Sequence, residues 1–211
     1  METIRWTPTT RWLHLGLAFS VTIQLLLSLA LEEPGEAEGV GRWALIGHEL
    51  FGLLVLSLAV LHWGWILAGH DGGWRRLLPW DGEGRRAVWT DLKGLLGMRL
   101  PEGGPRAGLP SLVEGLGLLV VTAQGSVGLA IFVVLPPAGS IPERFEFLYQ
   151  IHGIIGSLVW LYWFGHVGMA LVHRLAGDET LRMISPFRQD GVSEPNARAL
   201  EPKGKGDRGE L

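Results

Sequence analysis

Four long apolar runs separate the polar parts of the chain and predict four membrane-spanning helices. The runs are approximately Trp12–Leu31, Trp43–Ala68, Leu112–Leu135 and Phe147–Val172. A helix needs about 20 mostly apolar residues to cross a hydrocarbon core about 30 Å thick, and each run is long enough. The pattern therefore predicts an all-α fold, an integral membrane four-helix bundle formed by residues 1–176.

The connection between the second and third runs, residues 70–110, contains a segment with helical periodicity. Within Arg85–Leu100, apolar residues repeat at helical spacing on one face, and charged residues occupy mostly the other. The apolar face comprises Val88, Trp89, Leu92, Leu95 and Leu96. Such a segment favours an amphipathic helix that lies on the inner membrane surface.

Lysine and arginine are distributed unevenly between the connections, which predicts an orientation. Sixteen of them lie in the N-terminal segment, in residues 70–110 and after Val172, whereas the other two connections contain only Arg42 and Arg144. The positive-inside rule then predicts a multi-pass membrane protein with both termini in the cytoplasm. Residues 177–211 are polar and rich in proline and glycine, and we expect them to form a flexible cytoplasmic tail.

Composition limits the chemistry that the protein can support. Of 211 residues, 47% are hydrophobic and 18% are charged, and the net charge is −3, so we expect membrane lipid as a partner and no nucleic acid. The chain has no cysteine. This absence excludes disulfides, cysteine-ligated iron–sulfur clusters, thiolate-bound haem and covalent c-type haem attachment. Any haem in this protein must be non-covalent and bound by histidine.

Four histidines form two pairs with the same spacing. His48 and His62 lie on the second run, and His152 and His166 lie on the fourth, and the members of each pair are fourteen positions apart. Over fourteen residues a helix rises about 21 Å and returns to within about 40° of the same face. The two histidines of each pair therefore lie on the same face of their helix at two depths in the membrane. Two such helices can bind two stacked haems.

Depth in the membrane indicates which histidines share a haem. The second and fourth runs cross from outside to inside, so His48 and His152 form an outer pair, and His62 and His166 lie deeper. The first run crosses in the opposite direction, which brings His14 to the inner level as well. His166 therefore has two candidate partners, His14 and His62.

A packing argument favours His14 as that partner. A haem ring against a helix needs a small residue about one turn after its ligand. Ala18 occupies that position after His14, whereas Ile66 occupies it after His62. On this interpretation His62 is a neighbour of the haem or of a quinone. His173 and Arg11 lie near the same level and are further candidates for haem-propionate or quinone neighbours.

Several of these residues stand in motifs that resemble the bacterial cytochrome b561 family and the related b-type subunits of nickel–iron hydrogenases and formate dehydrogenases. Arg11-Trp-Leu-His14 resembles the R-x-x-H opening of the family, and Ile151-His-Gly-Ile-Ile-Gly through Gly165-His166 resembles its fourth helix, as do Leu171-Val-His173 and Asp178-Glu-Thr-Leu-Arg-Met. The resemblance covers about residues 5–186. Leu15, His62 and the long connection of residues 70–110 differ from the family pattern.

The resemblance implies two haem b groups, one bound by His14 and His166 and the other by His48 and His152. It implies electron transfer in a respiratory chain of the bacterial inner membrane, between a quinone (ubiquinone or menaquinone) and a redox partner such as a hydrogenase, a dehydrogenase or a cytochrome c. Two alternatives stay open at this point. One is a stand-alone superoxide:quinone oxidoreductase, and the other is a non-haem membrane anchor or a proton-relay or transport protein.

Overall fold

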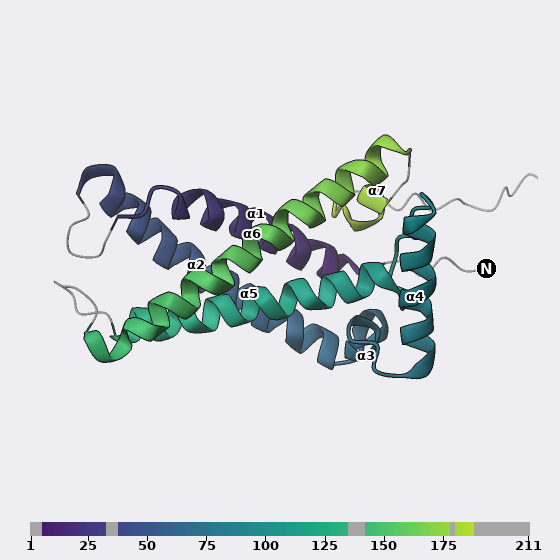
Figure 1. Cartoon of the computed structure of the whole chain (residues 1–211), viewed down its shortest axis with the longest axis horizontal. Coiled ribbons are helices and arrows are strands. Elements are labelled where there is room, and N and C mark those ends of the chain that lie inside the picture. Colours follow the sequence, from purple (N-terminus) through teal and green to yellow (C-terminus); the bar gives the residue numbers. More distant parts are fainter. Residues whose placement is uncertain (1–5, 33–37, 135–141, 178–179, 188–211) are drawn as a thin grey trace, which may run out of the picture.

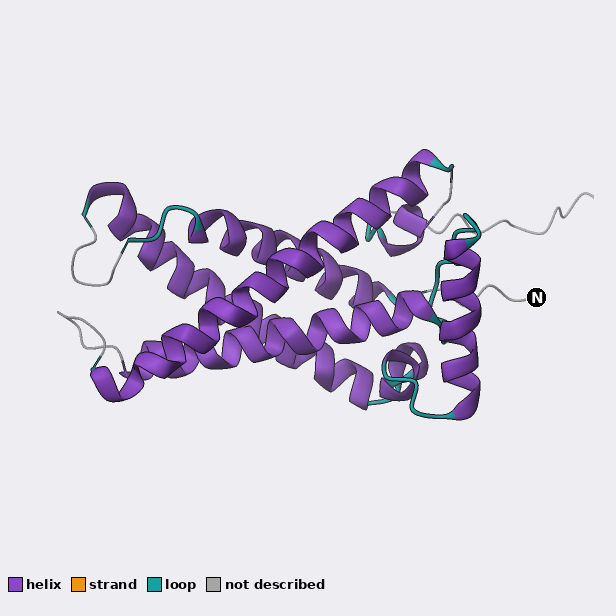
Figure 2. Cartoon of the chain, viewed as in Figure 1, coloured by secondary structure: helices purple, strands orange, loops and turns teal. Residues whose placement is uncertain are grey.

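The computed structural model of the protein describes residues 6–32, 38–134, 142–177 and 180–187. Within these ranges the chain forms helices, turns and loops and no strand (Figure 2), which confirms the all-helical prediction. The four longest helices are α1 (Pro8–Ser28), α2 (Gly39–Leu67), α5 (Leu109–Val134) and α6 (Glu146–Leu175). They run lengthwise beside one another (Figure 1), with α1 packed on α2, α2 on α5 and α5 on α6.

Three segments of the described chain are long and apolar enough to cross a membrane: Gly39–Leu67, Leu109–Val134 and Glu143–Leu175. Large apolar side chains point outward from them; Leu161 and Phe164 on α6, for example, are 70% and 63% exposed. Such an apolar exterior is suited to lipid rather than to water. The first predicted run lies in α1, which is shorter and carries more polar residues, and it is not among these three segments.

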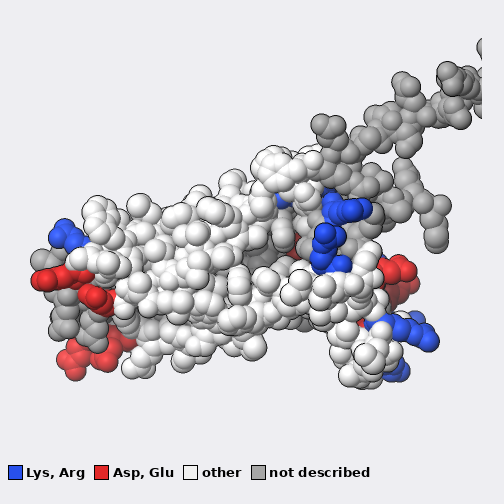
Figure 3. Space-filling model, turned by 90° about the horizontal axis from the view of Figure 1, so that it is seen from above, with Lys and Arg blue, Asp and Glu red and all other residues white. Residues whose placement is uncertain are grey.

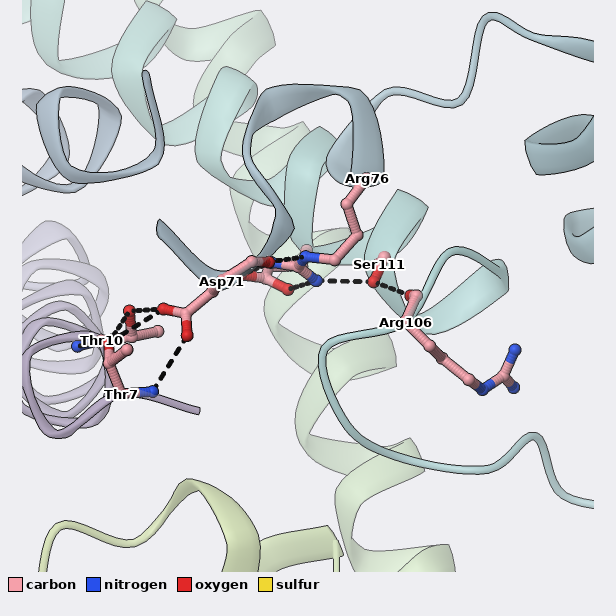
Figure 4. A network of polar contacts seen from close by, with 7 residues as sticks. Thr7, Thr10, Asp71, Arg76, Arg106 and Ser111 are labelled. Atoms are coloured by element: carbon pink, nitrogen blue, oxygen red, sulfur yellow. Dashed lines mark hydrogen bonds and ion pairs between the residues drawn. The ribbon is translucent and has the colours of Figure 1, made fainter. Parts of the chain in front are cut away.

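The N-terminus of α1 is fixed by a carboxylate that follows α2. Pro8 begins the helix, and the Thr7 side chain accepts a hydrogen bond from the Thr10 N–H, as is typical of an N-cap. Asp71 accepts hydrogen bonds from Thr7 N and Thr7 Oγ1, each at 3.0 Å, and from Thr10 Oγ1 (Figure 4). Asp71 lies in the short 3₁₀ helix η1 (His70–Gly72) and has a positive φ of 51°.

The same network continues from η1 into α5 through a partly buried ion pair. Arg76, in the short helix α3 (Trp74–Leu77), donates from Nε to the Asp71 carbonyl at 2.7 Å and from Nη1 to Ser111 Oγ at 2.6 Å. Its two Nη atoms lie 3.0 and 3.3 Å from the two carboxylate oxygens of Glu114. The Trp6 ring lies against the same guanidinium, with its centroid 4.5 Å away. These contacts hold α1, α3 and α5 together at one end of the molecule.

Helix α4 (Gly82–Leu96) lies across that end of the long helices (Figure 1). The structure confirms a helix in the segment predicted to be amphipathic, and its bounds differ from the predicted Arg85–Leu100. It begins earlier because the Asp81 side chain caps it by accepting from Gly84 N at 2.6 Å. It ends earlier because Gly97 forms the C-cap and Met98 adopts a positive φ of 59°.

Shortly after α6, within the predicted tail, the chain forms one more short helix, α7 (Thr180–Ile184). Phe187 then packs edge-on against Trp12 of α1, with ring centroids 5.4 Å apart. The segment that contains α7 therefore returns to the bundle. The remainder of the predicted tail, residues 188–211, lies outside the described residues.

Candidate functional site

His48 and His152 face each other across the bundle from α2 and α6. Their ring centroids are 6.2 Å apart, and the ring planes are inclined by 76°. Nδ1 of each ring is buried and has no hydrogen-bond partner within the described residues. Gln124 Nε2 on α5 lies 3.1 Å from His152 Nε2. The two rings that the sequence assigns to one level are thus brought together.

A cavity of about 410 Å³ opens at this pair and is lined by residues from all four long helices. This volume lies within the range of roughly 300–1,000 Å³ typical of small-molecule and cofactor sites. Gly52 and Gly156 are among the residues that line the cavity, each four residues after a histidine of the pair. Their missing side chains leave room beside the histidines for a flat group.

His14 and His166 form the second pair, between α1 and α6. Their ring centroids are 6.1 Å apart with an interplanar angle of 54°. Tyr162, one turn earlier on α6, stacks on His166 at 5.3 Å and 16°. The Tyr162 ring in turn lies over Gly117 of α5, where a Cβ atom would overlap it. Tyr162, itself packed on Gly117, fixes the direction in which the His166 ring points.

The third histidine at this level, His62, is buried but does not enter that ring pair. It is 4% exposed, and neither ring nitrogen has a hydrogen-bond partner within the described residues. It lies on the buried face of α2, near His14. Of the other candidate neighbours, Arg11 and His173 are both buried, Arg11 near the start of α1 and His173 near the end of α6.

These arrangements can be compared with what an iron ion between two imidazoles requires. An imidazole nitrogen binds a first-row metal at about 2 Å and the ring centre lies about 1 Å further, so two axial imidazoles have centres about 6 Å apart. The observed separations of 6.1 and 6.2 Å match this value. No group of three or more His, Cys, Asp or Glu able to hold a metal occurs in the described part of the chain. Each histidine pair is therefore spaced as two imidazole ligands of one iron would be.

Matched contacts relate the helix pair α1–α2 to the pair α5–α6. Trp63 of α2 donates to Thr122 of α5 at 3.0 Å, and Trp163 of α6 donates to Thr22 of α1 at 3.0 Å. Each threonine in turn donates to the carbonyl four residues earlier on its own helix, at 2.6 and 2.7 Å. The two halves of the bundle thus make equivalent contacts with each other.

Two glutamines extend this equivalence into the cavity. Gln24 and Gln124 each follow their threonine by two residues, and both line the cavity. A Cβ atom at Gly52 would lie 3.2 Å from Gln24 Nε2, and one at Gly156 would lie 3.3 Å from Gln124 Nε2. The sequence analysis did not predict a role for either glutamine. The repeated Thr-x-Gln spacing in the first and third apolar runs is the signal that could have identified them.

Comparison with known proteins gives one result for this chain. The sequence model of a protein family described as prokaryotic cytochrome b561 matches residues 5–186. No curated protein and no solved structure matches the chain.

Proposed function

Because the chain belongs to the prokaryotic cytochrome b561 family, we propose that it carries two haem b groups and transfers electrons between the quinone pool and a redox partner. The family makes it a membrane b-type cytochrome of electron transport that binds haem b. The observation that supports two haems is the presence of two histidine pairs with ring centres 6.1 and 6.2 Å apart. On this proposal, the protein acts in a bacterial respiratory chain.

We assign the axial ligands of the inner haem to His14 and His166, and those of the outer haem to His48 and His152. When bound, each haem supplies a single-electron redox centre. With two histidines holding it, each haem would exchange single electrons rather than carry out chemistry at the metal. The two sites are fourteen residues apart along α6, a rise of about 21 Å.

The side chains around each pair keep the sites dry and oriented. At the outer level the cavity lining is mostly apolar, and Gly52 and Gly156 provide space beside the ligands. At the inner level Tyr162 stacks on His166. His62, His173 and Arg11 are the proposed neighbours of the inner haem, in contact with its propionates or with a quinone. Buried cationic and imidazole groups suit such contacts because they bind carboxylates and carbonyl oxygens.

We further propose that α1 crosses the inner membrane with the other three long helices, and that both termini lie in the cytoplasm. In Figure 3, lysine and arginine gather at the end that carries α3 and α4, and the belt between the two ends shows neither positive nor negative side chains. That distribution supports a cytoplasmic position for this end by the positive-inside rule. Residues 1–176 would then be the haem domain and residues 177–211 a cytoplasmic extension. Candidate partners in this orientation are a hydrogenase, a dehydrogenase or a cytochrome c, with ubiquinone or menaquinone as substrate.

The proposal is tested by counting haems in the purified protein and in histidine variants. We expect about two non-covalent haems per chain, extractable with acidic acetone, with low-spin reduced bands. His48→Ala or His152→Ala should remove one haem, and His166→Ala should remove the other. His70→Ala is the matched control, because His70 is exposed and stacks on Trp65 away from both pairs. A protein that stays colourless with haem supplied contradicts the proposal and favours a non-haem membrane protein.

A further inference from the structure

Beside the outer histidine pair, the structure leaves two ring nitrogens and two amide oxygens buried without hydrogen-bond partners among the described residues. The nitrogens are Nδ1 of His48 and Nδ1 of His152, and the oxygens are Oε1 of Gln24 and Oε1 of Gln124. All four side chains line the same cavity. An unpaired buried polar group costs about 1–3 kcal/mol, so four of them at one site indicate that a bound group changes their pairing.

The contact between Gln124 and His152 shows how the pairing changes. The amide N–H of Gln124 donates to His152 Nε2 at 3.1 Å when the ring carries its proton on Nδ1. Iron requires that same Nε2 lone pair. Once the lone pair is bound to iron, the amide must release it, while the Nδ1–H of the ring still lacks an acceptor. The amide oxygen of Gln124, which lines the same cavity, can then accept a hydrogen bond from this Nδ1–H.

The second half of the bundle repeats this arrangement. Gln24 lies beside Gly52 as Gln124 lies beside Gly156, and the distances from the amide nitrogen to the position that a Cβ atom would occupy at each glycine are nearly equal, 3.2 and 3.3 Å. The His48 ring also lies close to the backbone of Gln24. Each histidine of the outer pair therefore has one glutamine beside it, supplied by α1 and α5 at equivalent positions.

We propose that Gln24 and Gln124 are a matched pair of positioning residues for the outer haem, each accepting the Nδ1–H of its neighbouring histidine ligand. This inference rests on the proposed ligation of a haem by His48 and His152. An acceptor on the outer nitrogen of a metal-bound imidazole fixes the ring orientation and raises its basicity. A more basic ligand stabilises the oxidised iron. The two glutamines thus lower the reduction potential of the outer haem and leave that of the inner haem unchanged.

The test is a redox titration of the intact, haem-loaded protein with Gln24→Leu, Gln124→Leu and the double variant. Loss of a hydrogen bond worth about 0.5–1.5 kcal/mol changes an equilibrium about two- to twelvefold. We expect each single variant to raise the ratio of reduced to oxidised outer haem at fixed ambient potential by that factor. A tenfold change is about 59 mV for a one-electron couple. The two single variants should shift by similar amounts, and the double variant should shift further.

Two further kinds of variant separate a hydrogen-bonding role from simple packing. Gln24→Glu and Gln124→Glu keep an acceptor oxygen and should hold the potential at or below that of the unchanged protein. Thr22→Val and Thr122→Val remove polar contacts within the bundle without touching the histidines, and they should leave both potentials unchanged. If a Leu variant loses the outer haem, recovery of that haem in the Glu variant supports the proposal, and its absence there overturns it.

The outcomes also distinguish this inference from the proposed function. The paired role is overturned, while the proposed function stands, if the protein binds two haems and the Gln→Leu variants leave the outer potential unchanged. The same conclusion follows if only one of the two substitutions shifts that potential. If instead His48→Ala and His152→Ala both retain two haems, the assignment of the outer ligands fails, and the role of the glutamines fails with it.

Discussion

The partly buried ion pair between Arg76 and Glu114 makes a strong prediction about stability, because its guanidinium is buried. Arg76 is 6% exposed, and among the described residues its Nη2 atom donates only to Glu114. Glu114→Leu therefore leaves a buried guanidinium with the Ser111 hydroxyl and the Asp71 carbonyl as its remaining acceptors. Removing one partner of a buried pair typically costs about 3–5 kcal/mol, because the other charge stays desolvated and uncompensated.

This cost can be measured as a change in melting temperature. For a chain of 150–250 residues, 1 kcal/mol corresponds to about 2–4 °C, so Glu114→Leu should lower Tm by roughly 6–20 °C. Thermal unfolding of the haem-loaded protein in detergent, followed by circular dichroism, gives the value. The double variant Arg76→Met with Glu114→Leu should recover more than half of the loss, because it removes the stranded charge. Glu83→Leu, at an exposed position of α4, should change stability by no more than about 0.5 kcal/mol. A Glu114→Leu protein that melts within the error of the unchanged protein would refute this reasoning.

Two other predictions concern the inner site. Gly117→Ala should destabilise the protein by about 1–3 kcal/mol, because the added methyl overlaps the Tyr162 ring; Gly64→Ala, at an exposed position of α2 with open space around it, is the control in the same unfolding assay. His14→Ala should abolish the low-spin inner haem in the reduced spectrum, whereas His62→Ala should keep that haem and shift its potential through altered hydrogen bonding. Loss of the inner haem in His62→Ala together with two low-spin haems in His14→Ala would assign the ligand to His62 instead.

The positions of the long helices could be predicted because apolar runs of sufficient length carry that information locally. The depth of each histidine followed from helix rise and chain direction, so the grouping of His48 with His152 needed no tertiary information. Sequence spacing did not decide between His14 and His62. That choice depends on how closely α1 approaches α6, and in the structure it is the His14 ring that lies beside His166.

The polar contacts could not be predicted from local pattern. Thr7 and Asp71 are 64 residues apart, and Asp71 meets the start of α1 from a turn in which it adopts a positive φ. In the sequence, Glu114 lies at the start of an apolar run, and no local pattern identifies its partner, because Arg76 is one of several cations in the same connection. The glutamine pair differs from these cases. Its Thr-x-Gln repeat is present in the sequence, but its significance emerges only when the two helix pairs are seen to make equivalent contacts.

The bond between Asp71 and the start of α1 has a consequence for biosynthesis. Thr7 and Thr10 leave the ribosome well before the carboxylate that holds them, because all of α2 is made in between. The N-terminal helix therefore cannot settle into its final position until the second helix and η1 have been translated. At that stage His14 and His48 already stand on a joined hairpin, while His152 and His166 await synthesis of α6. Under the proposed ligation, incorporation of either haem with both of its histidines must accordingly follow translation of nearly the whole bundle.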